Sequence, residues 1–136
     1  MTPTRIHHIN FVVYDLEKAM LQFERALGLE EFEIVEHRIR GSRVARSRVG
    51  ETWFVLVCPD DPESVPGRYL NQHGEGFFLI SLGYNDLAQQ LEHLEARNVH
   101  ISDQEPRSGI VDWQVADIGE VNGVLLQMTD DAAAPR

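Results

Sequence analysis

The sequence predicts an α+β protein that contains two copies of a strand–helix–three-strand unit. The first observation is size, because 136 residues suffice for one domain or for two small modules that share a core. The second is composition, since 43% hydrophobic and 25% charged residues are typical of a soluble globular protein. The third is a repeated order of elements, in which the helix caps Asp15 and Asp86 stand 71 residues apart.

The first copy covers residues 1–58. Apolar and polar residues alternate from 6 to 13, which is the period of a strand. Asp15 is a candidate N-cap, apolar residues then recur at helical spacing, and Gly28 can end the helix. Turns at residues 41–42 and 50–51 separate three further strand-like runs, over residues 31–38, 43–49 and 53–58.

Residues 59–76 are rich in proline, glycine and acidic residues, and we interpret them as a linker. The second copy then covers residues 77–129. It has a strand over 77–82, a helix that Asp86 caps and that ends near Asn98, and strand candidates at 100–101, 110–115 and 124–128. Residues 130–136 are expected to be a loose tail. We expect one structural domain overall. The alternative is an α+β domain in which the order of helices and strands repeats only by coincidence.

The charge and the cysteine count exclude several classes of protein. The chain has 22 acidic and 12 basic residues, and its net charge of −10 argues against nucleic acid and anionic membranes as partners. A single cysteine, Cys58, excludes an internal disulfide and a cysteine-rich metal site. The sequence shows neither a membrane-spanning run nor the apolar core of a signal peptide, so we expect a cytoplasmic protein.

Three segments together resemble a known superfamily. They are His-Ile-Asn-Phe-Val-Val-Tyr-Asp-Leu-Glu-Lys-Ala at 8–19, Leu-Gly-Tyr-Asn-Asp-Leu at 82–87 and Asn-Gly-Val-Leu-Leu-Gln-Met at 122–128. Their order and spacing resemble the vicinal oxygen chelate superfamily, which includes glyoxalase I, bleomycin-resistance proteins, extradiol dioxygenases and methylmalonyl-CoA epimerase. The last segment is most similar to the epimerase-like branch, and the resemblance covers about residues 6–129.

The resemblance implies two paired βαβββ modules that form a curved eight-stranded mixed sheet. It places the helices on the convex side and the ligand on the concave face, and it implies a homodimer. In metal-dependent members, four positions on the concave face bind a divalent metal that acts as a Lewis acid. The resemblance places these positions at His8, Val55, Leu79 and Gln127.

Val55 and Leu79 have no atoms that can bind a metal, so the resemblance implies a degraded metal site. We therefore expect no metal cofactor. If a divalent metal binds, its ligands include His8 and Gln127.

The same face is a candidate site for a small molecule, because such sites are mostly apolar with a few polar groups. A filled core with satisfied polar groups is the alternative. His8 is also the candidate catalytic residue, since an imidazole with an ordinary pKa near 6.5 can act as a general base. The candidate ligand-binding residues on this face are His8, Asn10, Trp53, Val55, Leu79, Ser81 and Gln127.

A cluster of five arginines lies between residues 38 and 48 of this acidic chain. Like charges on neighbouring strands need anionic partners, which nearby glutamates, a partner subunit or an anionic ligand can supply. A carboxylate, a phosphate or coenzyme A would suit this cluster. Arg46 and Arg48 therefore join the candidate ligand-binding residues.

These observations favour a glyoxalase/bleomycin-resistance-like protein that binds a small anionic or aromatic molecule in the cleft. The alternative is a metal-dependent epimerase, lyase or dioxygenase that uses His8 and Gln127. A third possibility is a subunit with a vestigial cleft and a role in assembly. Whether the chain is an enzyme stays open at this point.

Overall fold

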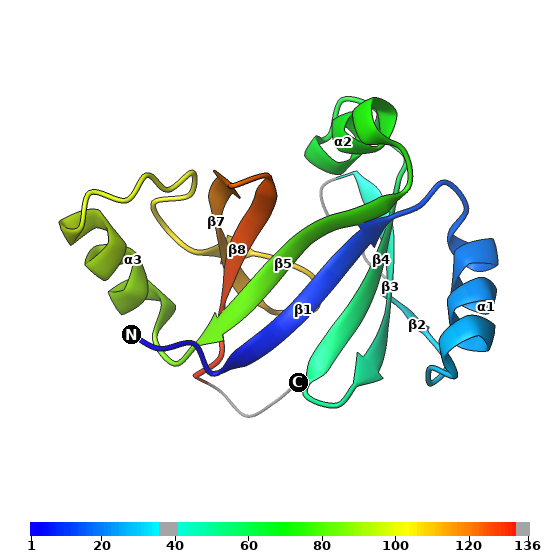
Figure 1. Ribbon diagram of the computed structural model, residues 1–136, viewed down its shortest axis with the longest axis horizontal. Helices are drawn as coiled ribbons and strands as arrows, with labels where there is room; N and C mark the ends of the chain where they lie inside the picture. Colours follow the sequence, from blue (N-terminus) through cyan, green and yellow to red (C-terminus); the bar gives the residue numbers. More distant parts are fainter. Residues whose placement is uncertain (36–40, 133–136) are drawn as a thin grey trace. The chain divides into compact units, whose positions relative to one another are not determined.

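The computed structural model describes residues 1–35 and 41–132 (Figure 1). Its contacts divide the chain into two compact units. The N-terminal unit is Ile9–Phe78, and the C-terminal unit combines Met1–His8 with Leu79–Arg136. Strands β1 (Arg5–Val12) and β5 (Gly76–Tyr84) each run through both units.

The eight strands form one mixed sheet in the order β2-β3-β4-β1-β5-β8-β7-β6. Strand β5 pairs with β8 in parallel, whereas β3 pairs with β2 and β4, and β7 with β6 and β8, in antiparallel fashion. The predicted α+β class with an eight-stranded mixed sheet is therefore confirmed. The remaining strands are β2 (Glu33–Val35), β3 (Ser42–Val49), β4 (Thr52–Pro59), β6 (Arg107–Ser108), β7 (Gln114–Val121) and β8 (Val124–Asp130).

In the N-terminal unit, helix α1 (Leu16–Leu27) packs against β3 and β4. The Asp15 carboxylate accepts a hydrogen bond from the Lys18 backbone N–H at 3.1 Å, which satisfies a free donor of the first turn. Gly28 ends the helix in the left-handed region at φ 66°. The apolar face of the helix covers a core of Val13, Leu16, Ala19, Phe32, Ala45, Phe54 and Leu56.

In the C-terminal unit, helix α3 (Leu87–Ala96) packs against β8. The Asp86 carboxylate accepts from the Gln89 backbone N–H at 3.0 Å, so both predicted caps are present. Leu87 is completely buried at the start of this helix. The core of this unit consists of Tyr84, Leu87, Leu91, Ile101, Ala116 and Met128.

The segment predicted as a linker contains a further helix, α2 (Val65–His73). The Ser64 hydroxyl accepts from the Gly67 backbone N–H at 3.0 Å, and Pro66 stands in the first turn, where proline needs no hydrogen-bonded N–H. No helix among the described residues is both long enough and apolar enough to cross a membrane.

Three strand predictions need correction. Residues 100–101 form no strand, although Ile101 is buried in the core of its unit. Of the run at 110–115, only Gln114 and Val115 belong to a strand, β7, and the residues before them form a turn. Of the run at 31–38, the described part contains only the short strand β2, and residues 36–40 lie outside the described residues.

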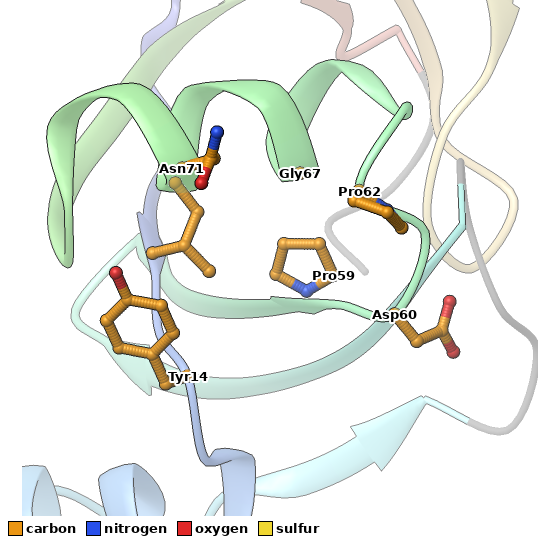
Figure 2. A pocket seen from close by; sticks show the side chains of 7 residues that line it. Tyr14, Pro59, Asp60, Pro62, Gly67 and Asn71 are labelled. Carbon is orange, nitrogen blue, oxygen red and sulfur yellow. The ribbon is translucent and has the colours of Figure 1, made fainter.

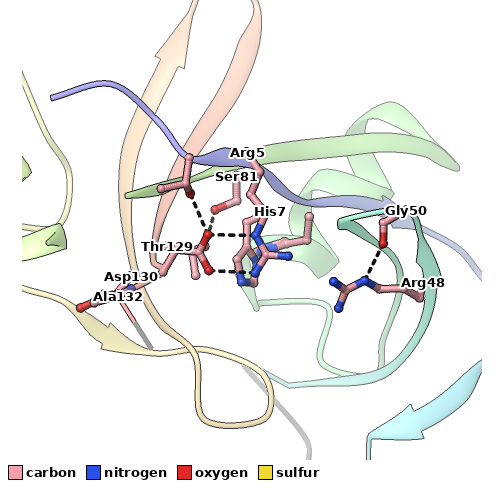
Figure 3. A network of polar contacts seen from close by, with 11 residues as sticks. Arg5, His7, Arg48, Gly50, Ser81, Thr129, Asp130 and Ala132 are labelled. Atoms are coloured by element: carbon pink, nitrogen blue, oxygen red, sulfur yellow. Dashed lines mark hydrogen bonds and ion pairs between the residues drawn. The ribbon is translucent and has the colours of Figure 1, made fainter. Parts of the chain in front are cut away.

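The chain after β8 is held at Asp131, although the tail was predicted to be loose from residue 130. The Asp131 carboxylate accepts two hydrogen bonds from the Arg5 guanidinium, at 2.9 and 2.8 Å, and one from the Thr4 hydroxyl at 2.7 Å (Figure 3). The side chains of Arg5 and Asp131 are only 9% and 12% exposed. This ion pair therefore fixes the start of β1 to the segment that follows β8.

Candidate functional site

The polar centre of the C-terminal unit is a cluster of His7, His8 and Trp113, all of them buried. The His8 ring stacks on the Trp113 indole, with ring centroids 4.8 Å apart, and the His7 ring meets the same indole edge-on at 4.6 Å. The Nδ1 atoms of the two histidines lie 2.9 Å apart. Because a hydrogen bond needs one donor and one acceptor, one Nδ1 carries the proton and the other accepts it.

Trp113 reaches this cluster from the turn that precedes β7. The Gly109 backbone N–H donates to the Trp113 carbonyl at 2.7 Å, and the Trp113 backbone N–H donates to the Ile110 carbonyl at 3.0 Å. Between them, Val111 adopts φ 56°, a conformation that β-branched residues rarely take. The contact of Trp113 with the two histidines has no signal in the sequence, because they are more than a hundred residues away in the chain.

The environment of His8 lowers its pKa from 6.5 to about 3. Burial is the largest cause, because the charged imidazolium loses its hydration, and the neighbouring His7 and Arg5 lower the pKa further. Hydrogen bonding to Gln127 raises the pKa of His8, but by less than the other effects lower it. His8 is therefore a neutral imidazole at physiological pH, and with so low a pKa it is a weak base.

This pKa has a measurable consequence for stability. The unfolded chain takes up a proton at His8 near pH 6.5, whereas the folded chain does so only near pH 3, so acid favours the unfolded state in this interval. When the pH falls from about 6.5 to 5, the unfolding free energy of the wild type should decrease by about 2 kcal/mol more than that of His8→Gln. Urea unfolding of both proteins at both pH values measures this difference. If stability depended on pH equally in the two proteins, the low pKa of His8 would be contradicted.

Gln127 lies beside this cluster and belongs to a chain of polar contacts across β6, β7 and β8. Its side-chain Nε2 donates to the Asp117 carboxylate at 3.0 Å, and the two residues face each other in the β7–β8 register. Arg107 donates to the other Asp117 oxygen at 2.8 Å and to Asp103 at 3.0 Å. The Gln127 side chain is buried and also interacts with His8.

Ser81 and Leu79 lie on β5 in the same unit, and both are buried. The Ser81 hydroxyl shares a 2.6 Å hydrogen bond with the Thr129 hydroxyl of β8 (Figure 3). Ser81 is thus satisfied within the protein. Of the predicted site residues, the C-terminal unit therefore contains His8, Leu79, Ser81 and Gln127.

The other predicted site residues belong to the N-terminal unit. The Arg46 guanidinium lies 3.9 Å from the centre of the Trp53 ring, and that of Arg48 lies 4.9 Å from it. Cation–π attraction stabilises this arrangement. In the β3–β4 register, Arg48 faces Trp53 and Arg46 faces Val55. In the same unit, the buried Asn10 Oδ1 has no hydrogen-bond partner.

Part of the arginine cluster has glutamate partners, as one of the sequence interpretations expected. Arg46 forms an ion pair with Glu33 of β2, and Arg43 forms one with Glu17 of α1 at 2.8 Å. Arg48 donates from Nε to the Gly50 carbonyl at 2.8 Å. Arg38 and Arg40 lie outside the described residues.

A small pocket of about 180 Å³ lies elsewhere in the N-terminal unit (Figure 2). It lies between helix α2 and the end of β4, where the rings of Tyr14, Pro59 and Pro62 surround it (Figure 2). No predicted site residue belongs to its lining, which consists of Tyr14, Pro59, Asp60, Pro62, Gly67, Leu70 and Asn71.

The residues at the four positions that the resemblance assigned to a metal do not fit a divalent ion. Val55 and Leu79 offer only hydrocarbon, and Gln127 offers an uncharged amide. The Nδ1 atom of His8 is already paired with His7. Across residues 1–35 and 41–132, no group of three or more histidine, cysteine, aspartate or glutamate side chains is arranged to hold a metal.

A mixed eight-stranded sheet with repeated strand–helix units defines a class of proteins to which this chain can be assigned. The sequence profile of the Glyoxalase/Bleomycin resistance protein/Dioxygenase superfamily matches residues 7–116, and the chain belongs to this superfamily. The uncharacterized protein YqjC of Bacillus subtilis (strain 168) is 28% identical over 131 residues, which cover 93% of this chain and 91% of the relative.

Solved structures of methylmalonyl-CoA epimerases have the same fold. One epimerase, in complex with methylmalonyl-CoA and NH4+, has a TM-score of 0.89 and 25% identity over 98% of this chain and 99% of its own. A Streptomyces coelicolor epimerase variant in complex with 2-nitronate-propionyl-CoA has a TM-score of 0.88 and 25% identity, covering 97% and 100%. The Mycobacterium tuberculosis epimerase has a TM-score of 0.84 and 23% identity, covering 96% and 90%. These similarities confirm the superfamily and the branch expected from the sequence.

Proposed function

We propose that this chain is a glyoxalase/bleomycin-resistance-like protein that binds a small anionic or aromatic molecule without a divalent metal. The observation that carries the proposal is the set of side chains at the four assigned positions. Two are hydrocarbon, one is a neutral amide, and the fourth, His8, is a buried imidazole stacked on Trp113. Such a set supplies neither the charge nor the number of ligands that a catalytic metal requires.

The arginine–tryptophan group of the N-terminal unit supports the class of ligand. Arg46 and Arg48 bring two guanidinium groups to one indole, and guanidinium groups bind carboxylates and phosphates through paired hydrogen bonds. The indole ring adds a flat apolar surface for a planar molecule. The structural relatives in complex with methylmalonyl-CoA and with 2-nitronate-propionyl-CoA bind acyl-CoA compounds, which are anionic molecules.

Metal content tests this proposal against the second candidate, a metal-dependent epimerase, lyase or dioxygenase that similarity to the epimerases favours. The protein is purified without a histidine tag, incubated with Fe, Ni, Co or Zn, dialysed and analysed by elemental mass spectrometry. We expect far less than one metal per chain, because the donor set is too weak. Near-stoichiometric metal would overturn the proposal in favour of the metal-dependent enzyme.

The homodimeric state and the cytoplasmic location that the sequence predicts are part of the same proposal. Light scattering during size-exclusion chromatography tests the first of them. A monomer at micromolar concentration would contradict the homodimer without bearing on the ligand.

A further inference from the structure

We propose that the turn formed by Asn122 and Gly123 is a site of spontaneous deamidation, where the asparagine side chain is converted through a cyclic imide into aspartate or isoaspartate. The turn joins β7 to β8 within the C-terminal unit. This inference goes beyond the proposed function, because it concerns a covalent modification of the chain and not its ligand.

The first step is the conformation of the turn. Val121 of β7 pairs with Val124 of β8, so only two residues connect the strands. Asn122 has φ 51° and Gly123 has φ 83°, and two positive φ angles define a type I′ hairpin turn. The hydrogen bond that closes such a turn joins its first and fourth residues. The backbone N–H of Gly123 is therefore not used to close the turn.

The second step is access to the turn. All four residues from 121 to 124 are exposed to solvent. A Cβ atom built on Gly123 would meet no atom within 4 Å beyond its chain neighbours, so no other segment crowds this position. The tip of a hairpin can open without unfolding the core of its unit, because only local hydrogen bonds break. Asn122 thus has the room to cyclise, and water can reach the product.

The third step is the reaction itself. The backbone nitrogen of Gly123 loses its proton to solvent and attacks the side-chain carbonyl carbon of Asn122, Cγ. The new N–Cγ bond closes a succinimide ring, and the Cγ–Nδ2 bond breaks to release ammonia, which takes up a proton. Water then opens the ring. Attack at Cγ gives aspartate, whereas attack at the backbone carbonyl leaves the chain running through Cγ, as isoaspartate. The sum consumes one water and releases one ammonia, without an oxidant or a reductant.

The residue that follows an asparagine decides whether this reaction is fast. Asn122 is the only one of the five asparagines in the sequence that precedes a glycine. Glycine has no Cβ, so its nitrogen can approach Cγ closely. Asn98 is a matched comparison within the same chain, since it is also exposed and has φ 59° but precedes Val99. The β-branched side chain of Val99 crowds the nitrogen that would attack.

The two products should affect the hairpin differently. Aspartate tolerates positive φ, so it preserves the turn and adds one carboxylate next to Glu120. Isoaspartate adds a carbon to the backbone of a two-residue turn, whose ends are fixed by the pairing of Val121 with Val124. Because loop length selects the turn type, we expect isoaspartate to destabilise the tip of the hairpin.

The test follows both asparagines in the same sample of the full-length protein. The protein is incubated at physiological temperature and mildly alkaline pH, and peptide mass spectrometry measures the exchange of each amide for a carboxyl group. We expect Asn122 to be converted about ten-fold or more faster than Asn98, because glycine leaves the nitrogen accessible whereas valine crowds it. The rate at Asn122 should increase with pH, since the nitrogen attacks after it loses its proton.

Two variants separate the parts of the proposal. Gly123→Asp keeps a residue type that type I′ turns accept, but its side chain hinders the nitrogen, so conversion of Asn122 should slow about five-fold or more. Asn122→Asp has no amide to lose and represents the aspartate product. Its melting temperature should stay constant during incubation, whereas that of the wild type should decrease as isoaspartate accumulates.

Each outcome supports or overturns a stated part. If Asn122 stays intact, or if Asn122 and Asn98 are converted at equal rates, the turn is not a deamidation site. Undiminished conversion of Asn122 in Gly123→Asp would also overturn the proposal, because the accessible nitrogen of glycine would not be its cause. If the converted wild type melts at the same temperature as Asn122→Asp, isoaspartate does not destabilise the hairpin.

Discussion

Replacement of Asp131 by alanine is expected to lower the free energy of unfolding by about 3 kcal/mol. The reason is that Arg5, whose side chain is 9% exposed, would keep its charge and lose both hydrogen bonds to the carboxylate. Removing one side of a buried ion pair costs far more than the pair contributes when intact. Urea denaturation of the wild type and the variant measures the loss. Glu120→Ala, which removes an exposed carboxylate of β7, is the matched control and should change little.

The same ion pair predicts the direction of a pH effect. Burial acts to raise the pKa of Asp131, but the hydrogen bonds from Arg5 and Thr4 outweigh it and hold the pKa below its usual value. The pair therefore contributes stability above the pKa of the unfolded aspartate, near 3.9, and loses it as the pH falls through the folded value. If Asp131→Ala costs less than about 1 kcal/mol at neutral pH, the pair does not fix the chain as described.

Replacement of Trp113 by alanine is expected to cost about 4 kcal/mol of unfolding free energy. The indole is 1% exposed, and it fills the space against His7 and His8 while held by the turn before β7. Its removal leaves a large cavity between polar rings, which the neighbouring side chains cannot fill. Thermal and urea unfolding report the loss.

Trp113→Phe separates ring stacking from simple volume. It keeps a flat ring against His8, so it should lose less than half as much stability as the alanine variant. Trp53→Phe is the companion control, because Trp53 is only partly buried and its partners are arginines. Equal losses in Trp113→Ala and Trp53→Phe would show that Trp113 is not a principal support of its unit.

The parts of the fold that the sequence predicts well are those with a local signal. Asp15 and Asp86 cap their helices through side-chain contacts three residues ahead, so a short window contains the whole interaction. The alternation of residues 6–13 likewise predicts which side chains turn toward α1, and Ile9, Phe11 and Val13 indeed pack in that core. The resemblance supplied the rest of the topology.

Helix α2 was missed because its first turn contains Pro66 and Gly67, which are usually signals of a loop. The decisive signal was present, since Ser64 followed two residues later by a proline is a typical helix start. Strand β7 was misplaced for another reason. The register shift between Asp117 and Gly119 breaks the alternation on which strand prediction depends.

The candidate site was predictable in its list of side chains but not in their partners. Strand alternation selects His8, Ser81 and Gln127 without any knowledge of the third dimension. That Trp113 stacks on His8, and that Asp117 turns the amide of Gln127, depends on contacts between segments distant in sequence. No local pattern encodes such contacts. A one-residue shift in the register of β7 would have removed the contact between Asp117 and Gln127.

The fluorescence of Trp113 depends on the histidine rings beside it. Protonated imidazole quenches indole fluorescence much more strongly than neutral imidazole does. In a Trp53→Phe background, the emission of Trp113 therefore reads the charge of the histidine rings against which it lies. The protonation of these rings can thus be followed in dilute solution without a dye, from the spectrum of one native side chain.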